Sequence, residues 1–382
     1  MRAKVILHID TRREFGRGIV SGIAKYSHRY GPWVFYQENF ELKKSLSLLK
    51  KWGANGIVVH VPDPIMAKKV IPSGMPAVAI TVNELVKGVP NIMGNAIAIG
   101  EMGANYLIDR GFRQFAYCGF SDMLYSQKRA ASFCATVNRA GFETHYYERP
   151  QLLIRTSWQD EELRMAKWLK SLPKATGLMA CNDDCGRYVI ECCELAGLHI
   201  PDDIAVLGVD NDTMVCDLTT PALSSIVLSL ERAGYDAAEL LDKLMKNKKV
   251  EKNHHIVFSP LYVETRVSTD IYHIEDPEII EGIRYIANNS RKSIIVDDVA
   301  KAVAISRRSL ERRFRNKLGH SVNDQIKHQR VEQVIRMLLD TTLSISQIAY
   351  ALDFEGSNNL ARYFRQVKGM TPMEYRKKCG QK

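Results

Sequence analysis

The chain lacks the segments that would carry it into or across a membrane. None of its apolar runs approaches the roughly eighteen residues that a membrane-spanning helix requires. The first apolar run, directly behind Met1-Arg-Ala-Lys4, is too short for the core of a signal peptide. Low-complexity tracts are also absent. We therefore expect a cytosolic protein, and its 382 residues are enough for two or three domains that each have a core.

The sequence also lacks the motifs of a metal centre, a phosphate site or a catalytic centre. Its eight cysteines are scattered, and Cys181 and Cys185 have no second pair of ligands nearby, which favours buried thiols in a reducing compartment. Gly16 and Gly18 are not followed by the Gly-Lys-Ser/Thr of a phosphate-binding loop. No nucleophile with a plausible base is recognisable. These absences predict a protein without metal, cofactor or enzymatic activity.

Charge is distributed unevenly along the chain, whose formal net charge is +10. Residues 276–382 hold 20 Lys and Arg against 12 Asp and Glu, a net charge of +8. Residues 1–275 hold 33 against 31, a net charge of +2. This distribution is expected if only the C-terminal part binds a polyanion.

Within that basic part, residues 296–319 and 345–369 repeat one pattern. Val296, Val299, Ala300 and Val303 match Ile345, Ile348, Ala349 and Leu352, and Ser306, Leu310, Phe314 and Gly319 match Gly356, Leu360, Phe364 and Gly369. An apolar stripe with spacing i, i+3, i+4, i+7, a short break, a capping residue and a second helix ended by Gly are typical of a helix-turn-helix. The pattern therefore predicts two helix-turn-helix units.

The second helix of each unit carries basic and amide side chains opposite its apolar residues. Arg pairs with guanine and phosphate, and Asn can pair with adenine through two hydrogen bonds. A solvated face of a plain helical bundle is the alternative, but two copies in register argue against it. We predict that the DNA-binding residues are Arg307, Arg308, Glu311, Arg312, Arg315, Asn358, Asn359, Arg362 and Arg365.

Between the two units, residues 322–339 have the apolar periodicity of one long amphipathic helix. Such a helix would be ~27 Å long. Successive major grooves on one side of DNA are ~34 Å apart. We call the second helix of each unit its reading helix. A rigid connecting helix of this size could place the two reading helices in neighbouring grooves, so that one chain covers roughly two turns of duplex.

Residues 276–378 resemble the DNA-binding domain of the arabinose-regulator (AraC) family of transcription factors. The most specific stretch is Gly369-Met-Thr-Pro372-Met-Glu-Tyr-Arg376. The chain departs from the family pattern at Asp353, where the family usually has Gly, and at Leu360, where it usually has an aromatic residue. The resemblance implies an all-α tandem helix-turn-helix domain that binds double-stranded DNA.

The first 266 residues alternate short β-branched runs with segments of helical period. This alternation predicts parallel sheets covered by helices on both faces. It occurs in two successive halves, which predicts two doubly wound lobes with a cleft between them. We place a linker at residues 267–275 and the DNA-binding domain at residues 276–382.

Polar side chains follow the predicted strands, where open parallel sheets bind their ligands. Carboxylate, amide and guanidinium groups suit a ligand rich in hydroxyl groups, because each hydroxyl both donates and accepts a hydrogen bond. The alternative for any one of these residues is that it caps the next helix. These residues are Asp10 to Glu14, Asp63, Asn83, Glu84, Asn182 to Asp184 and Asp210 to Asp212.

This front region resembles the sugar-sensing domains of the lac and gal repressor family, which look like periplasmic sugar-binding proteins. The resemblance is most specific in residues 177–183, 196–211 and 218–226. It implies that Arg129, Asn182 or Asp183, and Asp210 line a sugar site, and that Asp10 to Glu14 contribute from the other lobe.

A sugar domain followed by an AraC-type module resembles the bacterial regulators of xylose operons. The resemblance implies a homodimer that binds operator DNA and activates pentose-use genes when a sugar, D-xylose, binds. Three alternatives stay open: the effector is another sugar, a polyol or a non-sugar metabolite; the front domain serves only dimerisation; or the protein is an α/β enzyme tethered to nucleic acid. The last would need a general base in the cleft.

Overall fold

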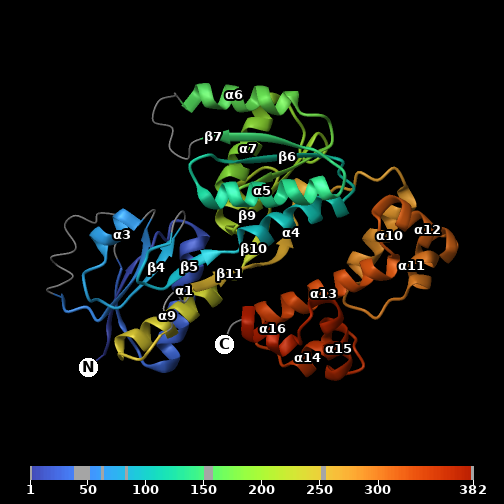
Figure 1. Ribbon diagram of the computed structural model, residues 1–382. Helices are drawn as coiled ribbons and strands as arrows, with labels where there is room; N and C mark the ends of the chain where they lie inside the picture. The colour runs from blue at the N-terminus through green and yellow to red at the C-terminus, as the bar shows by residue number, and fades with distance from the viewer. Residues whose placement is uncertain are drawn as a thin grey trace. The chain divides into compact units, whose positions relative to one another are not determined.

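In the computed structural model the chain forms two compact domains (Figure 1). The structure describes residues 2–37, 52–61, 64–81, 85–149, 158–250 and 255–379. We call residues 1–104 with 115–269 the α/β domain, and residues 105–114 with 270–382 the helical domain. None of the helices in the described segments is long and apolar enough to cross a bilayer.

The first lobe of the α/β domain is built on a six-stranded sheet with the order β11-β5-β4-β3-β1-β2. Its pairings are parallel. The strands are β1 (Lys4–His8), β2 (Val34–Gln37), β3 (Gly56–Val61), β4 (Ala77–Thr81), β5 (Asn91–Gly94) and β11 (His255–Phe258). Its helices are α1 (Glu14–Tyr30), α3 (Pro64–Val70) and α9 (Leu230–Met245). Residues 42–52, one of the segments of helical period in the sequence, lie almost entirely outside the described residues, and Asp63, Asn83 and Glu84 lie wholly outside them.

The second lobe has a six-stranded sheet with the order β12-β10-β9-β8-β6-β7. Its strands are β6 (Gln114–Phe120), β7 (Thr144–Arg149), β8 (Thr176–Ala180), β9 (Ile204–Val209), β10 (Ser224–Leu228) and the antiparallel β12 (Pro260–Glu264). Its helices are α5 (Leu124–Arg139), α6 (Trp158–Ser171), α7 (Asp183–Ala196) and α8 (Thr213–Leu218), and α4 (Ala96–Asp109) packs on α5. β8 and β9 are buried along their whole length, as expected for central parallel strands. The predicted fold class is confirmed.

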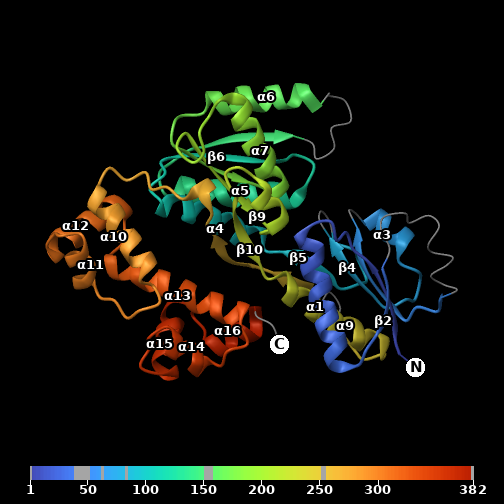
Figure 2. The same cartoon turned by 180° about the vertical axis from the view of Figure 1, so that it is seen from behind.

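The chain passes between the two sheets three times, after β5, after β10 and after β11. α9 and β11 therefore return to the first lobe, where α9 lies beside α1 (Figure 2). Two glycines allow the backbones of these helices to touch. A Cβ at Gly22 would lie 1.9 Å from the carbonyl oxygen of Glu231, and one at Gly234 would lie 2.0 Å from that of Ile19.

The residues predicted as a linker are divided between the two domains. Val267–Thr269 forms the short 3₁₀ helix η1 in the α/β domain. Ser268 is buried there, and its hydroxyl donates a 2.6 Å hydrogen bond to the carbonyl oxygen of Val206. The helical domain resumes at Asp270.

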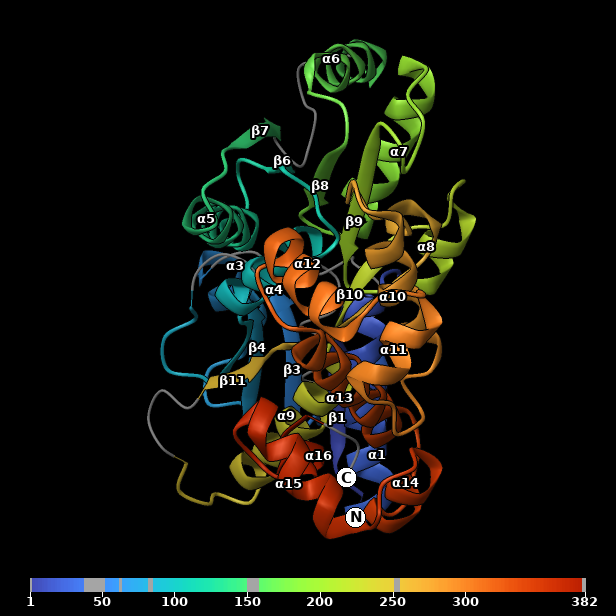
Figure 3. The same ribbon diagram turned by 90° about the vertical axis from the view of Figure 1, so that its right-hand side faces the viewer.

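The helical domain contains both units predicted from the repeat. Its helices are α10 (Pro277–Asn288), α11 (Val296–Ala302), α12 (Arg307–Leu318), α13 (Val322–Asp340), α14 (Ile345–Ala351), α15 (Ser357–Lys368) and α16 (Pro372–Cys379). The first unit is α11 with α12, the second is α14 with α15, and α13 joins them (Figures 2 and 3). At 19 residues, α13 is about 28 Å long.

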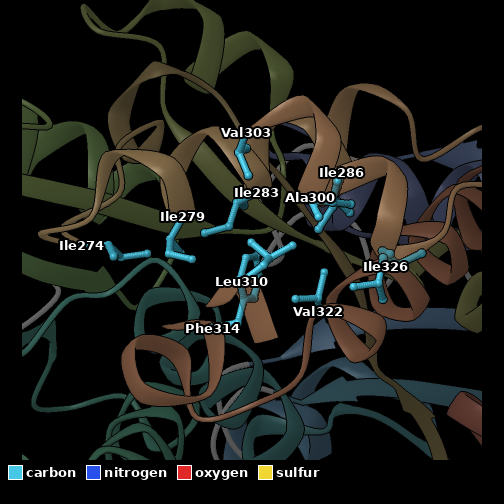
Figure 4. Close-up of a cluster of buried hydrophobic side chains, with 12 residues drawn as sticks. Ile274, Ile279, Ile283, Ile286, Ala300, Val303, Leu310, Phe314, Val322 and Ile326 are labelled. Atoms are coloured by element: carbon cyan, nitrogen blue, oxygen red, sulfur yellow. The ribbon is translucent and has the colours of Figure 1, made fainter. Parts of the chain in front are cut away.

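The pattern residues of the first unit perform the structural roles expected of them. Leu310 and Phe314 are fully buried in a cluster that joins α10, α11, α12 and the start of α13 (Figure 4). The hydroxyl of Ser306 accepts a hydrogen bond from the backbone N–H of Ser309 and caps α12. Gly319 ends that helix with a left-handed φ of 81°, and Gly369 ends α15 with a φ of 70°.

Candidate ligand site and DNA-binding surface

Residues that follow three different strands meet at a small cavity between the lobes of the α/β domain. Glu14 is the first residue of α1, Asp183 is the first residue of α7, and Asp210 follows β9. The cavity has a volume of about 10 Å³ and is lined by Arg13, Glu14, Asp183, Asp184, Asp210, Asp212 and Val215. That volume holds about one water molecule. A larger ligand therefore needs the lobes to move apart here.

Two ion pairs and a hydrogen bond join the lobes beside this cavity. Arg13 contacts Asp184 at 2.6 Å, and Arg17 contacts Asp212 at 2.6 Å. The backbone N–H of Glu14 donates to the same Asp212 carboxylate at 2.9 Å. Neither Arg17 nor Asp212 is among the predicted ligand residues, although Asp212 lies in the polar run that follows β9. Which members of such a run cross to the other lobe depends on the lobe contact, which sequence spacing does not contain.

Asn182 and Asp183 mainly shape the protein around the site. The side-chain oxygen of Asn182 accepts a 2.9 Å hydrogen bond from the backbone N–H of Cys185, so Asn182 caps α7, the alternative considered for such residues. Asp183 is 2% exposed. One of its carboxylate oxygens accepts from the Ser225 hydroxyl at 2.5 Å, and the other accepts from the backbone N–H of Asp212 at 2.7 Å. Asp183 thus holds the loop that carries Asp210.

Asp210 is a constrained and partly desolvated carboxylate. Its φ is 108° and that of Asn211 is 52°, in the left-handed region that non-glycine residues adopt at a cost. Burial raises the pKa of Asp210 to about 6, although the positive charge of Arg129, 3.9 Å away, opposes that shift. Arg129 is held in turn by the carbonyl oxygen of Cys181 and lies over the ring of Tyr125. This pair can offer both an acceptor and a donor to a polar ligand.

Asp10 lies after β1, as predicted, but its carboxylate is engaged by its neighbour Arg12. Arg12 donates to it from the guanidinium at 2.9 and 2.8 Å and from the backbone N–H at 3.0 Å. These hydrogen bonds lower the pKa of Asp10. The structure brings Glu14, Asp183 and Asp210 together around the cavity, and places Asp10, Asn182 and Arg129 outside its lining.

In the helical domain, α12 presents exposed arginines on the side away from its buried residues. Arg308, Arg312 and Arg315 are exposed, whereas Leu310 and Phe314 are fully buried. Arg307 is also exposed and contacts Asp297 at 3.2 Å, and Glu311 is half-buried. Arg313 faces inward and binds Asp276, the N-cap of α10, which fixes α12 to that helix.

The second unit repeats this arrangement on α15. Asn358, Arg362 and Arg365 are exposed, and Leu360 and Phe364 are fully buried. Asn359 is half-buried, and its amide donates a 3.2 Å hydrogen bond to Glu355. Leu360 packs in the interior despite its departure from the family pattern. The exposed cations and amide have the chemistry that reads base edges and phosphates.

The domains correspond to two known families. Residues 104–269 match the periplasmic binding protein-like domain, and residues 299–378 match a helix-turn-helix domain. The chain is 28% identical to the xylose operon regulatory protein of Escherichia coli K12, over 98% of this chain and 97% of that one. The chain thus joins a periplasmic-binding-protein-like domain to an AraC-type helix-turn-helix domain, and it is related over its whole length to xylose operon regulators.

Further comparisons agree with that arrangement. It is 27% identical to the xylose operon regulatory protein of Haemophilus influenzae, with 98% of each chain covered. A solved structure of a xylose-binding transcription activator matches with a TM-score of 0.62 and 26% identity, covering 100% of this chain and 99% of that one. The transcription regulator CcpA of Lactococcus lactis shares the fold of the α/β domain, with a TM-score of 0.58 and 19% identity over 71% of this chain.

Proposed function

We propose that this regulator binds a pentose, D-xylose, between the lobes of its α/β domain and in response activates transcription of pentose-use genes in the cytosol. The observation that carries the proposal is the convergence of Glu14, Asp183 and Asp210 from three strand ends on one inter-lobe cavity, beside Arg129. The relatives that span the full chain are xylose operon regulators and a xylose-binding activator. Asp10 and Asn182 remain proposed ligand contacts in the conformation with the lobes apart.

The ligand would act by changing the balance between lobe arrangements. In the structure, the Arg13–Asp184 and Arg17–Asp212 pairs bridge the lobes. A sugar that hydrogen-bonds these carboxylates would replace the bridges by its own hydroxyl contacts. Its differential affinity for the two arrangements is the only free energy available for the switch.

The DNA-binding role is proposed for all nine residues of the two reading faces. The principal contacts would come from six exposed residues on the outward faces, Arg308, Arg312, Arg315, Asn358, Arg362 and Arg365. Arg307, Glu311 and Asn359 would contact DNA from the edges of the helices, Arg307 after leaving Asp297 and Asn359 after leaving Glu355. Two units on one chain would place both helices in successive major grooves.

Thermal unfolding against a panel of sugars tests the ligand. A ligand at one hundred times its dissociation constant stabilises the folded state by about 2.7 kcal/mol, which moves the transition by several degrees. We expect a shift with D-xylose, and smaller or no shifts with arabinose, ribose, glucose and ribitol. A shift with another compound would replace the effector but keep the site. Flat curves with every compound would contradict a sugar site.

The dimer is proposed to form on a second surface of the α/β domain, between α7 and α8. A groove of about 440 Å³ there is lined by apolar and charged residues of both helices. Leu218 is 82% exposed and Met214 is 65% exposed. Three charged residues of α7 line the same groove, Arg187, Glu191 and Glu194, and a two-fold axis would bring them opposite the same residues of a second copy.

Replacing Leu218 by Glu should therefore convert a dimer into a monomer. Each copy would bury this leucine, and each buried leucine contributes about 1.5–3 kcal/mol, so the dissociation constant should rise at least ~100-fold. Sedimentation measures the change. The control is Leu163→Glu on α6, where the leucine is 62% exposed outside the groove. A dimer that survives L218E would place the interface elsewhere.

A further inference from the structure

The turn of the second helix-turn-helix unit is tied to the segment that precedes the first. The connection centres on Arg330 of α13, which is only 4% exposed. Its guanidinium donates to the carbonyl oxygen of Lys292, between α10 and α11, and at 2.9 Å to that of Leu352, at the end of α14. Because both acceptors are backbone atoms, the contact fixes the path of the chain just before the first unit and in the turn of the second.

Two aromatic rings of the second unit enclose the same guanidinium. Arg330 lies 4.3 Å from the ring centre of Phe354 and 5.8 Å from that of Tyr363 on α15. The two rings contact each other edge to face, with centres 5.3 Å apart. A planar cation between rings and carbonyl groups has few orientations open to it. The contact between Arg330 and Tyr363 thus fixes the position of the reading helix α15 relative to α13.

Asp353 makes the second connection between the units. Its carboxylate accepts a 3.0 Å hydrogen bond from the backbone N–H of Ser293. Its φ is 55°, in the region where glycine is favoured, so its side chain is kept at a conformational cost. An exposed, strained residue with a specific bond to another element points to a role for the side chain.

The internal repeat supplies a comparison for this position. Ala304 occupies the corresponding place in the first unit and has nearly the same φ, 53°. Its methyl group cannot accept a hydrogen bond. The turn therefore forms without a carboxylate, and what Asp353 adds is the contact with Ser293.

We propose that Arg330 and Asp353 form a clamp that sets the angle between the two reading helices, and so the spacing of the two DNA half-sites that one chain accepts. This inference rests on the proposed DNA-binding function. The length of α13 sets the distance between the units, whereas rotation of one unit about the end of α13 needs a second restraint. The restraint matters because one base pair of extra spacing turns a half-site by roughly 34°.

Asp353→Gly removes the clamp contact in a variant that should fold, because glycine relieves the strained φ of an exposed residue. Spin labels at N316C and Q366C, exposed and equivalent positions of α12 and α15, report the distance between the units in the full chain. C134S and C379S remove the two half-buried cysteines from labelling. We expect a broader distance distribution in D353G than in the wild type. Asp353→Asn keeps an acceptor and tolerates the same φ, so it should match the wild type.

The functional consequence is measured on DNA duplexes that the wild-type full chain selects from a random pool in the presence of D-xylose. Changing the half-site spacing by one base pair should lower the DNA affinity of the wild type. The same change should lower the affinity of D353G by a factor that is roughly 2- to 10-fold smaller, because one hydrogen bond of this kind shifts an equilibrium by about that much. Equal distance distributions in wild type and D353G, or equal spacing penalties, would overturn the clamp. If no duplex is selected, the proposed function fails, and the distance measurement still decides the clamp.

Discussion

Replacing Arg312 and Arg362 together by alanine is expected to weaken binding to the selected operator by roughly 30-fold or more, since each lost base or phosphate contact costs about 1–3 kcal/mol. Both residues are exposed on the outward faces of α12 and α15, one in each unit. Neither supports the core, because Leu310 and Leu360 fill the buried side of these helices. Fluorescence anisotropy over a series of salt concentrations measures the loss and the change in salt dependence.

A control separates the reading faces from net charge. Arg284→Ala with Lys377→Ala removes the same two positive charges from exposed positions on α10 and α16. This pair should reduce affinity only slightly and leave base preference intact. Equal losses in the two double variants would mean that the arginines act as general charge, and would contradict a reading role for α12 and α15.

Replacing Asp210 by asparagine is expected to abolish most of the sugar response while making the ligand-free α/β domain more stable at pH 7. Asparagine keeps the strained backbone, which it tolerates at positive φ, and removes the carboxylate charge. Burial disfavours that charge, as the raised pKa of about 6 shows. One unit of pKa corresponds to about 1.4 kcal/mol. The free energy of unfolding should therefore rise by about 1–3 kcal/mol, and the unfolding temperature by a few degrees.

The pH dependence follows from the same carboxylate. Because its pKa is raised in the folded state, the folded protein binds more protons than the unfolded chain between the ordinary value of 3.8 and about 6. Wild-type stability should therefore fall as pH rises through this interval, and D210N should lack that component. The advantage of D210N should be present at pH 7 and vanish near pH 4.

Thermal unfolding with and without D-xylose measures both effects. Asp202→Asn, at an exposed position on the same lobe, is the control and should change neither stability nor response. An unchanged sugar shift in D210N would remove Asp210 from the ligand site. A loss of stability at pH 7 would show that Asp210 and Arg129 stabilise each other by more than burial costs.

The helical domain was predictable because its pattern is local. Residues such as Leu310 and Phe314 lie three and four positions apart on one helix, so periodicity alone states which face is buried. The repeat shows the same buried positions in both units. The length of α13 followed directly from the number of residues in the apolar stripe. The role of Asp353, which departs from the family pattern, needed the structure, because its hydrogen-bond partner Ser293 is distant in the sequence.

The α/β domain was predictable in its class and in most of its strands and helices. Alternating runs gave parallel sheets, but the short strands β5, β7, β11 and β12 and the helix α8 were not predicted. Four- to six-residue segments with exposed or polar positions carry little periodic signal. The return of α9 and β11 to the first lobe was also not predicted, since their partners α1 and β5 are far away in the sequence.

The sequence by itself determined the fold class, the two helix-turn-helix units and the strand ends that carry polar residues, because all three depend on spacing along the chain. Only the tertiary structure decided what each polar residue does. Asn182 caps a helix, Asp183 holds a loop and Asp210 faces the inter-lobe cavity, although all three follow strands in the same way. The difference lies in which backbone N–H groups and charges lie within about 3 Å of each carboxyl or amide group, and folding alone brings those partners together.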